Sequence, residues 1–261
     1  MFQSKDFTLA GISNKDMGVI IVYLDTPQTQ LGVNRTIKEG EAIQNIPVHF
    51  GSTNEPVSFS IQLSFVDKNE NPIIPSLQHK QKVIEWLFPK DNQYKAFIPE
   101  ENGLEYYIKF LNCQEVKYNN GLLLTLNART NSPFCYAPEN IITYHLNASK
   151  GFMDIEIDNK SNVDVIYKPI ILFKPNPNND SSVQLTVENK TTGDKFTIKN
   201  ININEQILIN CNRRFVFNEK YESKYLNMEG DFIRLAFGVN KLRLEGYGKL
   251  KIKTHFPMLM L

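Results

Sequence analysis

The sequence predicts a mainly β protein of two domains, a strand-rich first domain with one packed helix and a second domain built as a β-sandwich. Three observations predict this class. The 261 residues exceed the size of one ordinary domain. Short runs of alternating apolar and polar residues recur along the chain, whereas one segment has clear helical spacing. Apolar residues make up 41% of the chain, which is enough to form packed cores.

The clearest strand pattern spans residues 57–65, where apolar and polar residues alternate without a break. Because successive side chains of a strand point to opposite faces, the apolar side chains share one face and the polar ones share the other. The polar face carries four uncharged residues, Ser58, Ser60, Gln62 and Ser64. Solvated strand faces usually carry Lys or Glu, so we take these four residues as a candidate subunit interface. A sheet packed within the same domain would show the same pattern.

Further strands are expected in the first half over residues 18–23, 106–110 and 122–126. The last of these follows Asn119-Asn120-Gly121, a strong signal for a hairpin turn. These segments place several antiparallel strands in the first domain.

One helix is expected in the first half, from Leu77 to Phe88. Ser76 is a suitable N-cap and Pro89 ends the helix, since proline cannot continue it. Four apolar residues are expected to share its buried side: Leu77, Ile84, Leu87 and Phe88.

A proline-rich segment interrupts the periodicity at residues 131–138. We place the domain boundary there, which gives an N-terminal domain over residues 1–136 and a C-terminal domain over residues 137–261. Beyond the boundary, short strand patterns recur at a spacing of roughly 8–12 residues, as in a β-sandwich. The segment 249–253 alternates lysine with apolar residues, which predicts an edge strand protected by lysines.

Charge and cysteine content exclude several classes of protein. The formal net charge is +1, so the chain has no global field that would attract nucleic acid or an anionic membrane. No apolar run approaches the roughly 20 residues of a membrane span. The three cysteines form no CxxC motif, which favours synthesis in a reducing cytoplasm. We therefore expect neither nucleic-acid recognition nor membrane insertion.

No motif in the sequence predicts catalysis, a metal site or a cofactor site. The four histidines form no HExxH motif, and no GxSxG, GxxxxGK[ST] or GxGxxG motif occurs. Cys135 with His145 would resemble a nucleophile with its base, but a buried thiol is the stronger interpretation. Asp154 and Glu156 share one strand face, which is typical of a solvated side. We expect a protein that is not an enzyme and needs no cofactor.

Two clusters leave a binding function open. Arg213-Arg214, which precede two phenylalanines, have the composition of a nucleic-acid surface, but a strand exit is the stronger interpretation in a neutral chain. Sugar sites commonly use exposed aromatic side chains, and three tyrosines of the second half are candidates: Tyr221, Tyr225 and Tyr247. Trp86, the single tryptophan, belongs to the expected helix and not to the sandwich.

The order of several motifs resembles that of a known family. Residues 7–11 have the pattern F-x-x-x-G, and residues 16–20 have the pattern D-h-G-h-h, where h is a hydrophobic residue. Between them, Asn14 stands where serine is frequent. The helix ends with Trp86-Leu87, and a Pro-aromatic segment lies at 131–136. Further matching segments are the strand at 104–110 and the turns at 187–194 and 237–242. In this order the motifs resemble the distal tail protein (Dit) family of phage baseplates.

The resemblance implies a structural virion protein of the distal tail or baseplate. The N-terminal domains would form a hexameric ring that continues the tail tube, and the C-terminal domain would be a galectin-like or carbohydrate-module-like β-sandwich. Its partners would be the major tail (tube) protein, the tail-associated hub or lysin protein, and receptor-binding proteins. The alternative is a carbohydrate-binding tail protein that recognises host cell-wall sugars through the C-terminal sandwich. A wall-degrading enzyme finds no supporting residue pair.

Overall fold

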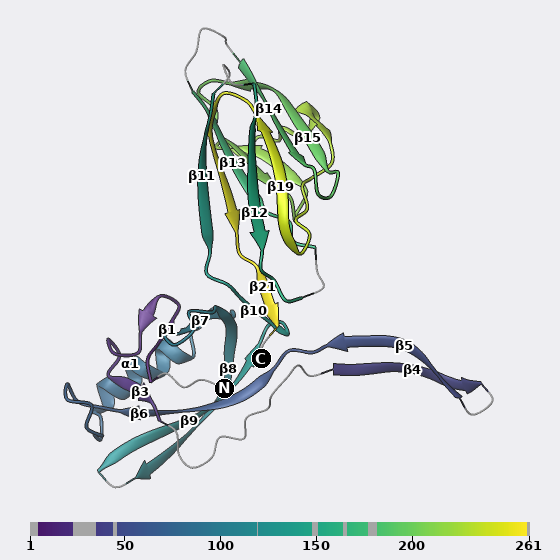
Figure 1. Cartoon of the computed structure of the whole chain (residues 1–261). Coiled ribbons are helices and arrows are strands. Elements are labelled where there is room, and N and C mark those ends of the chain that lie inside the picture. The colour runs from purple at the N-terminus through teal and green to yellow at the C-terminus, as the bar shows by residue number, and fades with distance from the viewer. Residues whose placement is uncertain are drawn as a thin grey trace. The chain divides into compact units, whose positions relative to one another are not determined.

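The computed structural model describes residues 5–22, 35–43, 46–118, 120–147, 151–163, 166–176 and 182–259. The chain forms two compact units (Figure 1). The first comprises Met1–Ala137 with Met258–Leu261, and the second comprises Pro138–Pro257. Both are built mainly from antiparallel strands, so the predicted mainly β class is confirmed.

The first unit is organised around a seven-stranded sheet with the order β2-β1-β7-β8-β9-β6-β3. Its strands are β1 (Phe7–Leu9), β2 (Ile12–Ser13), β3 (Val19–Ile21), β6 (Ser58–Phe65), β7 (Lys95–Pro99), β8 (Tyr106–Tyr118) and β9 (Gly121–Thr130). The alternation at 57–65 does form a strand, since Ile61, Leu63 and Phe65 are at most 6% exposed on one face. Tyr118 pairs with Gly121, so a short turn joins β8 to β9 as predicted. Asn119 in that turn lies outside the described residues.

The helix α1 (Leu77–Leu87) packs on this sheet. The hydroxyl of Ser76 accepts the backbone N–H of His79 at 3.2 Å, which confirms the predicted N-cap. The prediction for Leu77 was wrong, because its side chain is 81% exposed. The buried side of the helix is centred on Val83 and Leu87, which lie one turn apart. The apolar contacts of the helix therefore lie mainly in its second half. In its first turn, the ring of His79 packs edge-on against Phe65, and its Nε2 atom forms a hydrogen bond of 2.8 Å with the carbonyl of Met17.

The N-terminal motif forms a hydrogen-bonded corner around Asn14, whose side chain is fully buried. Its Oδ1 atom accepts the backbone N–H of Phe7 at 2.8 Å, and its Nδ2 group donates to the carbonyl of Val19 at 2.7 Å. One amide thus satisfies a donor of β1 and an acceptor of β3. Trp86 holds the same strand from the helix, since its indole N–H donates to the carbonyl of Leu9 at 3.2 Å.

A long hairpin lies between β3 and β6 in the sequence and was not predicted. It consists of β4 (Arg35–Ile43) and β5 (Ile46–Asn54). Among the described strands, these two pair only with each other (Figure 1). Charged residues and a glycine break the pattern of β4, and β5 has only a short apolar alternation, Ile46, Val48 and Phe50, which ends at Gly51.

The second unit is a β-sandwich of two five-stranded antiparallel sheets, as predicted (Figure 1). The first sheet, β11-β20-β13-β16-β17, contains β11 (Asn140–Leu146), β20 (Gly248–Thr254), β13 (Ile170–Pro175), β16 (Ile207–Asn210) and β17 (Phe215–Asn218). The second sheet, β12-β19-β14-β15-β18, contains β12 (Met153–Asn159), β19 (Gly238–Glu245), β14 (Ser182–Asn189), β15 (Lys195–Asn202) and β18 (Met228–Gly230). Their inner faces share one core, with Phe173 from one sheet and Phe196 from the other fully buried. Among the described residues of this unit, the one helical segment is the short 3-10 helix η2 (Tyr225–Asn227).

The C-terminal segment returns to the first unit. β21 (Pro257–Leu259) pairs with β10 (Phe134–Tyr136), and the thiol of Cys135 donates to the carbonyl of Met258 at 3.5 Å. The sequence-based bounds had placed the whole segment 137–261 in the second domain. A three-residue strand has too little periodicity to show which unit it joins.

The interpretation of segment 249–253 as an edge strand was wrong. β20 pairs with β11 on one side and with β13 on the other, so it lies inside its sheet. The lysines alternate outward because that face of the sheet is uncovered, and they protect no edge. No helix of the described residues is long and apolar enough to cross a membrane.

Candidate interaction surfaces

The outward face of the first sheet carries a ladder of uncharged polar side chains. The register places Ser60 of β6 opposite Asn127 of β9, and Asn127 opposite Asn112 of β8. The hydroxyl of Ser60 donates to Oδ1 of Asn127 at 2.5 Å, and Nδ2 of Asn127 donates to Oδ1 of Asn112 at 2.8 Å. The next row has the same character, with Gln62 opposite Thr125. We call the outward side chains Ser58, Ser60, Gln62, Asn112, Gln114, Thr125 and Asn127 the uncharged face.

The four predicted interface residues differ in exposure. Ser58 and Ser60 are exposed and Gln62 is partly exposed, whereas Ser64 is only 3% exposed. The hydroxyl of Ser64 donates to the carbonyl of Phe65, so this residue is satisfied within its own chain. Charge enters this side of the sheet at one end, where Arg129 lies opposite both Ser58 and Lys109.

The side-chain oxygen of Gln62 accepts no hydrogen bond from the described residues. Its Oε1 atom is buried and has no hydrogen-bond partner among the described residues. A buried acceptor without a donor costs about 1–3 kcal/mol. A donor from a second molecule would remove this cost.

The catalytic candidates Cys135 and His145 belong to different units. Cys135 is fully buried in the core of the first unit, and burial raises the pKa of its thiol. His145 lies on an exposed strand face of the second unit. The carboxylate of Asp154 is held by the guanidinium of Arg243 through two bonds of 2.9 Å, and this pairing lowers its pKa to about 2. Within the described residues, no group of three or more His, Cys, Asp or Glu could hold a metal ion.

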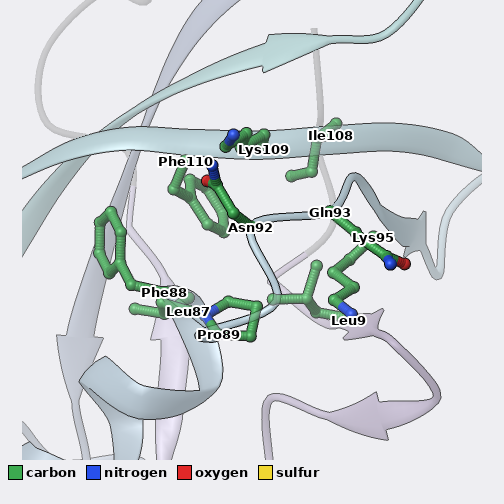
Figure 2. A pocket seen from close by; sticks show the side chains of 10 residues that line it. All are labelled: Leu9, Leu87, Phe88, Pro89, Asn92, Gln93, Lys95, Ile108, Lys109 and Phe110. Atoms are coloured by element: carbon green, nitrogen blue, oxygen red, sulfur yellow. The ribbon is translucent and has the colours of Figure 1, made fainter.

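A small hollow lies beside the end of the helix in the first unit (Figure 2). Leu87, Phe88 and Pro89 lie on one side, and Ile108 and Phe110 of β8 lie opposite them. Its volume is about 80 Å³, well below the roughly 300–1,000 Å³ of typical ligand sites. We interpret it as a packing gap at the joint between helix and sheet.

Two larger hollows lie in the second unit, and each contains one of the candidate tyrosines. Tyr225 lines a hollow of about 630 Å³, where its ring stacks on Phe232 with centroids 6.2 Å apart. Arg214 and Asp231 also line this hollow. Tyr247 lines a second hollow of about 370 Å³. Tyr221 is 86% exposed and lines neither of them.

Comparison with protein-family models shows to which family the chain belongs. A family model described as the phage tail protein N-terminal domain matches residues 2–132, half of the 261 residues. The chain belongs to this phage tail protein family. Membership identifies it as a structural protein of a phage tail, and a component of the tail belongs to the virion. No curated protein matches its sequence.

Solved structures show which fold this phage tail protein has. It is similar to the Dit protein (gp 19.1) of phage SPP1, which is described as a paradigm of the hub adsorption apparatus in phages that infect Gram-positive bacteria. The TM-score is 0.62 at 13% identity, over 97% of this chain and 98% of the SPP1 chain. A chain of the phage P2 baseplate, in its activated conformation with Ca, is similar with a TM-score of 0.54 at 10% identity, over 96% and 97% of the two chains. The phage tail protein therefore has a Dit-like fold, and the predicted resemblance is confirmed.

Proposed function

We propose that this phage tail protein is a distal tail protein whose N-terminal domains close into a hexameric ring. The ring would join the tail tube to the hub at the tail tip. The observation that carries the proposal is the likeness to SPP1 Dit over nearly the full length of both chains. The family match over residues 2–132 supports it independently, because that match covers the domain expected to form the ring.

The uncharged face supports a ring contact on physical grounds. Removing a charged group from water costs much more than removing a hydroxyl or an amide that retains its hydrogen bonds. Ser60, Asn127 and Asn112 already bond to one another, so another protein can cover them at low cost. Gln62 adds an acceptor that a neighbouring copy would satisfy. A contact of this kind, repeated around a ring, needs only modest energy at each interface.

The β4–β5 hairpin supports the same assignment. A two-stranded hairpin is only marginally stable alone in water. Each strand has nine residues, and neither pairs with another described strand. Ile37, near the start of β4, is 59% exposed. We propose that the hairpin packs on the neighbouring copy in the ring and is stabilised there.

The proposed role is that of a scaffold and not of an enzyme. Its partners would be five further copies of the chain, the major tail tube protein, the tail-associated hub or lysin protein, and receptor-binding proteins. The protein would be made in the cytoplasm of the bacterial host and then built into the distal tail. No nucleic-acid recognition is proposed, and Arg213 and Arg214 lie in the turn between β16 and β17.

The mass of the purified protein by light scattering, followed by negative-stain imaging, tests the ring. Particles of six copies with an open centre would support it. If the protein is a monomer, adding purified tail tubes tests whether the ring closes on the growing tail. A monomer that also leaves the tube end bare would contradict the proposal.

The hollow beside Tyr225 favours sugar binding as a second function. An aromatic stack next to a guanidinium and a carboxylate is suited to a sugar ring and its hydroxyl groups. A glycan array of cell-wall sugars tests this function with the Tyr225→Ala variant, and Tyr221→Ala is the matched control. Binding that Tyr225→Ala abolishes and Tyr221→Ala retains would support it, whereas an array without signal would rule it out.

A further inference from the structure

One outward face of the sandwich has an unusual composition. It belongs to the sheet β11-β20-β13-β16-β17, and the register shows which side chains point outward. These are Ile141, Thr143, His145, Lys249, Lys251, Lys253, Ile170, Leu172, Lys174, Leu208, Asn210, Phe215 and Phe217. We call this set the basic face. None of its five strands contains an aspartate or a glutamate.

The opposite sheet of the same domain differs sharply. Its strands carry six acidic residues, namely Asp154, Glu156, Asp158, Glu188, Glu229 and Glu245. They also carry the basic residues Lys195, Lys199, Lys241 and Arg243. Mixed charges of this kind are ordinary for a solvated sheet face. The absence of acids from the basic face is therefore a property of that face and not of the domain.

Basic side chains on this face lie directly beside one another. Lys249 is opposite His145 on one side and opposite Lys174 on the other. Like charges directly opposite each other across a sheet are destabilising. Lys253 forms an ion pair with Glu139, but Lys174, Lys249 and Lys251 form none with any described residue. The isolated domain thus accepts a repulsion that an acidic partner would relieve.

The rest of the basic face is apolar. Leu172 lies opposite both Lys251 and Leu208, and Leu208 lies opposite Phe217. These side chains are partly exposed, and Ile141 at the other edge is 51% exposed. Aliphatic side chains pack well against the apolar side chains of another protein, whereas a polyanion such as nucleic acid presents little apolar surface to them. A lysine row beside an apolar stripe therefore fits a polypeptide that is both acidic and apolar.

We propose that the basic face is the docking surface for an acidic segment of another tail protein, whose acidic and apolar side chains lie on the same side of the segment. The two-residue spacing of the lysines matches the period of an extended strand. This proposal rests on the proposed anchoring function in one respect: the partner is taken to be another protein of the phage tail. A second copy of the chain is a poor occupant, because its own acidic row on β12 is engaged. Arg243 and Lys190 hold Asp154, and Lys241 lies opposite Glu156.

A labelled peptide of sequence Glu-Ser-Glu-Ser-Leu-Ser-Leu tests the proposal on the full-length protein, because in an extended chain its Glu and Leu side chains all lie on one side. The double variant Lys249→Glu/Lys251→Glu is compared with Lys195→Glu/Lys241→Glu, which reverses two exposed lysines on the opposite sheet. We expect wild type and control to bind equally, and the face variant at least about tenfold more weakly. Equal binding by the face variant, or no binding by wild type, would overturn the proposal.

Two further measurements distinguish peptide docking from general polyanion binding and from a contact between copies of the chain. An oligodeoxythymidylate with the same charge as the peptide should bind wild type more weakly; equal affinity would mean an indiscriminate polyanion surface and would overturn the proposal. Light scattering of the same samples reports the ring. A variant that loses the peptide but retains the oligomeric state of wild type supports docking independently of ring formation. If peptide binding is lost only together with the oligomer, the basic face is a contact between copies and the proposal is wrong.

Discussion

The side chains of Asn189 and Asn240 meet in the interior of the second unit, where Nδ2 of Asn189 donates to Oδ1 of Asn240 at 3.1 Å. Both are fully buried, although the two residues are 51 positions apart in the sequence. They belong to the segments 187–194 and 237–242, which the resemblance singled out as turns; Asn189 is the last residue of β14 and Asn240 lies in β19. Asn240 also donates to the carbonyl of Ala236 at 2.8 Å and accepts the backbone N–H of Ala236 at 2.8 Å. The two motifs are thus parts of one buried hydrogen-bond network.

Replacing Asn240 by alanine should destabilise the second unit. The change leaves the backbone N–H of Ala236 and one donor of Asn189 without partners in the core. We expect a loss of roughly 2–3 kcal/mol in the free energy of unfolding, measured by urea denaturation. The control is Asn227→Ala, which removes a hydrogen bond at the surface and should cost less than about 0.5 kcal/mol. Equal stability of the two variants would contradict this network.

Asp194 should make stability depend on pH in acid. Burial raises the pKa of its carboxyl, but the hydrogen bonds from Arg234 and Thr192 outweigh burial, so its pKa lies below the ordinary value of 3.8. A lowered pKa stabilises the fold at pH values above 3.8, and this contribution is lost as the pH falls through the lowered pKa. We expect wild type to lose more stability than Asp194→Asn between pH 6 and roughly pH 2–3. Parallel curves of melting temperature against pH would disprove this role.

The charge reversal Lys249→Glu should stabilise the second unit while it weakens peptide binding. It replaces the repulsion between Lys249 and Lys174 with an attraction across the sheet. Cross-strand pairs of this kind shift the melting temperature by about 1–4 °C for a domain of this size. Differential scanning fluorimetry in low salt measures the shift, which high salt should reduce. A lower melting temperature would show that the lysines are already neutralised in the free protein.

Charge on the uncharged face should prevent ring formation without unfolding the subunit. Ser58 and Ser60 are exposed, so Ser58→Asp and Ser60→Asp each introduce a carboxylate that water solvates in the monomer but that a ring contact would bury. We expect both variants to remain folded by circular dichroism and to lose the mass of the hexamer in light scattering. Gln184→Glu, at an exposed position in the second unit, is the matched control and should retain the mass of wild type. A full-size ring from Ser60→Asp would remove this face from the interface.

Local patterns were sufficient for many of the elements. The unbroken alternation around Ile61 and Leu63 predicted β6, because a half-buried strand requires a period of two. Ser76 and Pro89 marked the ends of the helix through the chemistry of capping and the missing N–H of proline. The apolar segments after residue 138 predicted a sandwich, since short strands with turns must pair to bury one face each. In each case the signal came from residues close in the sequence.

The sequence was less informative about position within a sheet. The alternation at 249–253 correctly predicted a strand, but an edge strand and an inner strand with one open face have the same period. The exposure of Leu77 could not be predicted, since periodicity identifies a helix face and not the length over which the sheet covers it. The β4–β5 hairpin was missed because β4 has no regular alternation, and the alternation of Ile46, Val48 and Phe50 in β5 is short and ends at Gly51.

Local patterns in the sequence thus predicted the mainly β class and the helix, and the order of the motifs carried the resemblance to the distal tail protein family. Pairing between distant strands settled the surfaces. Both surfaces join residues that are far apart in the chain. On the first they are Ser60, Asn127 and Asn112, and on the second they are Lys174 and Lys249. Secondary structure follows from periodicities that span a few residues, whereas a binding surface depends on sheet order and register. Those arise only when the whole chain has buried its apolar faces together.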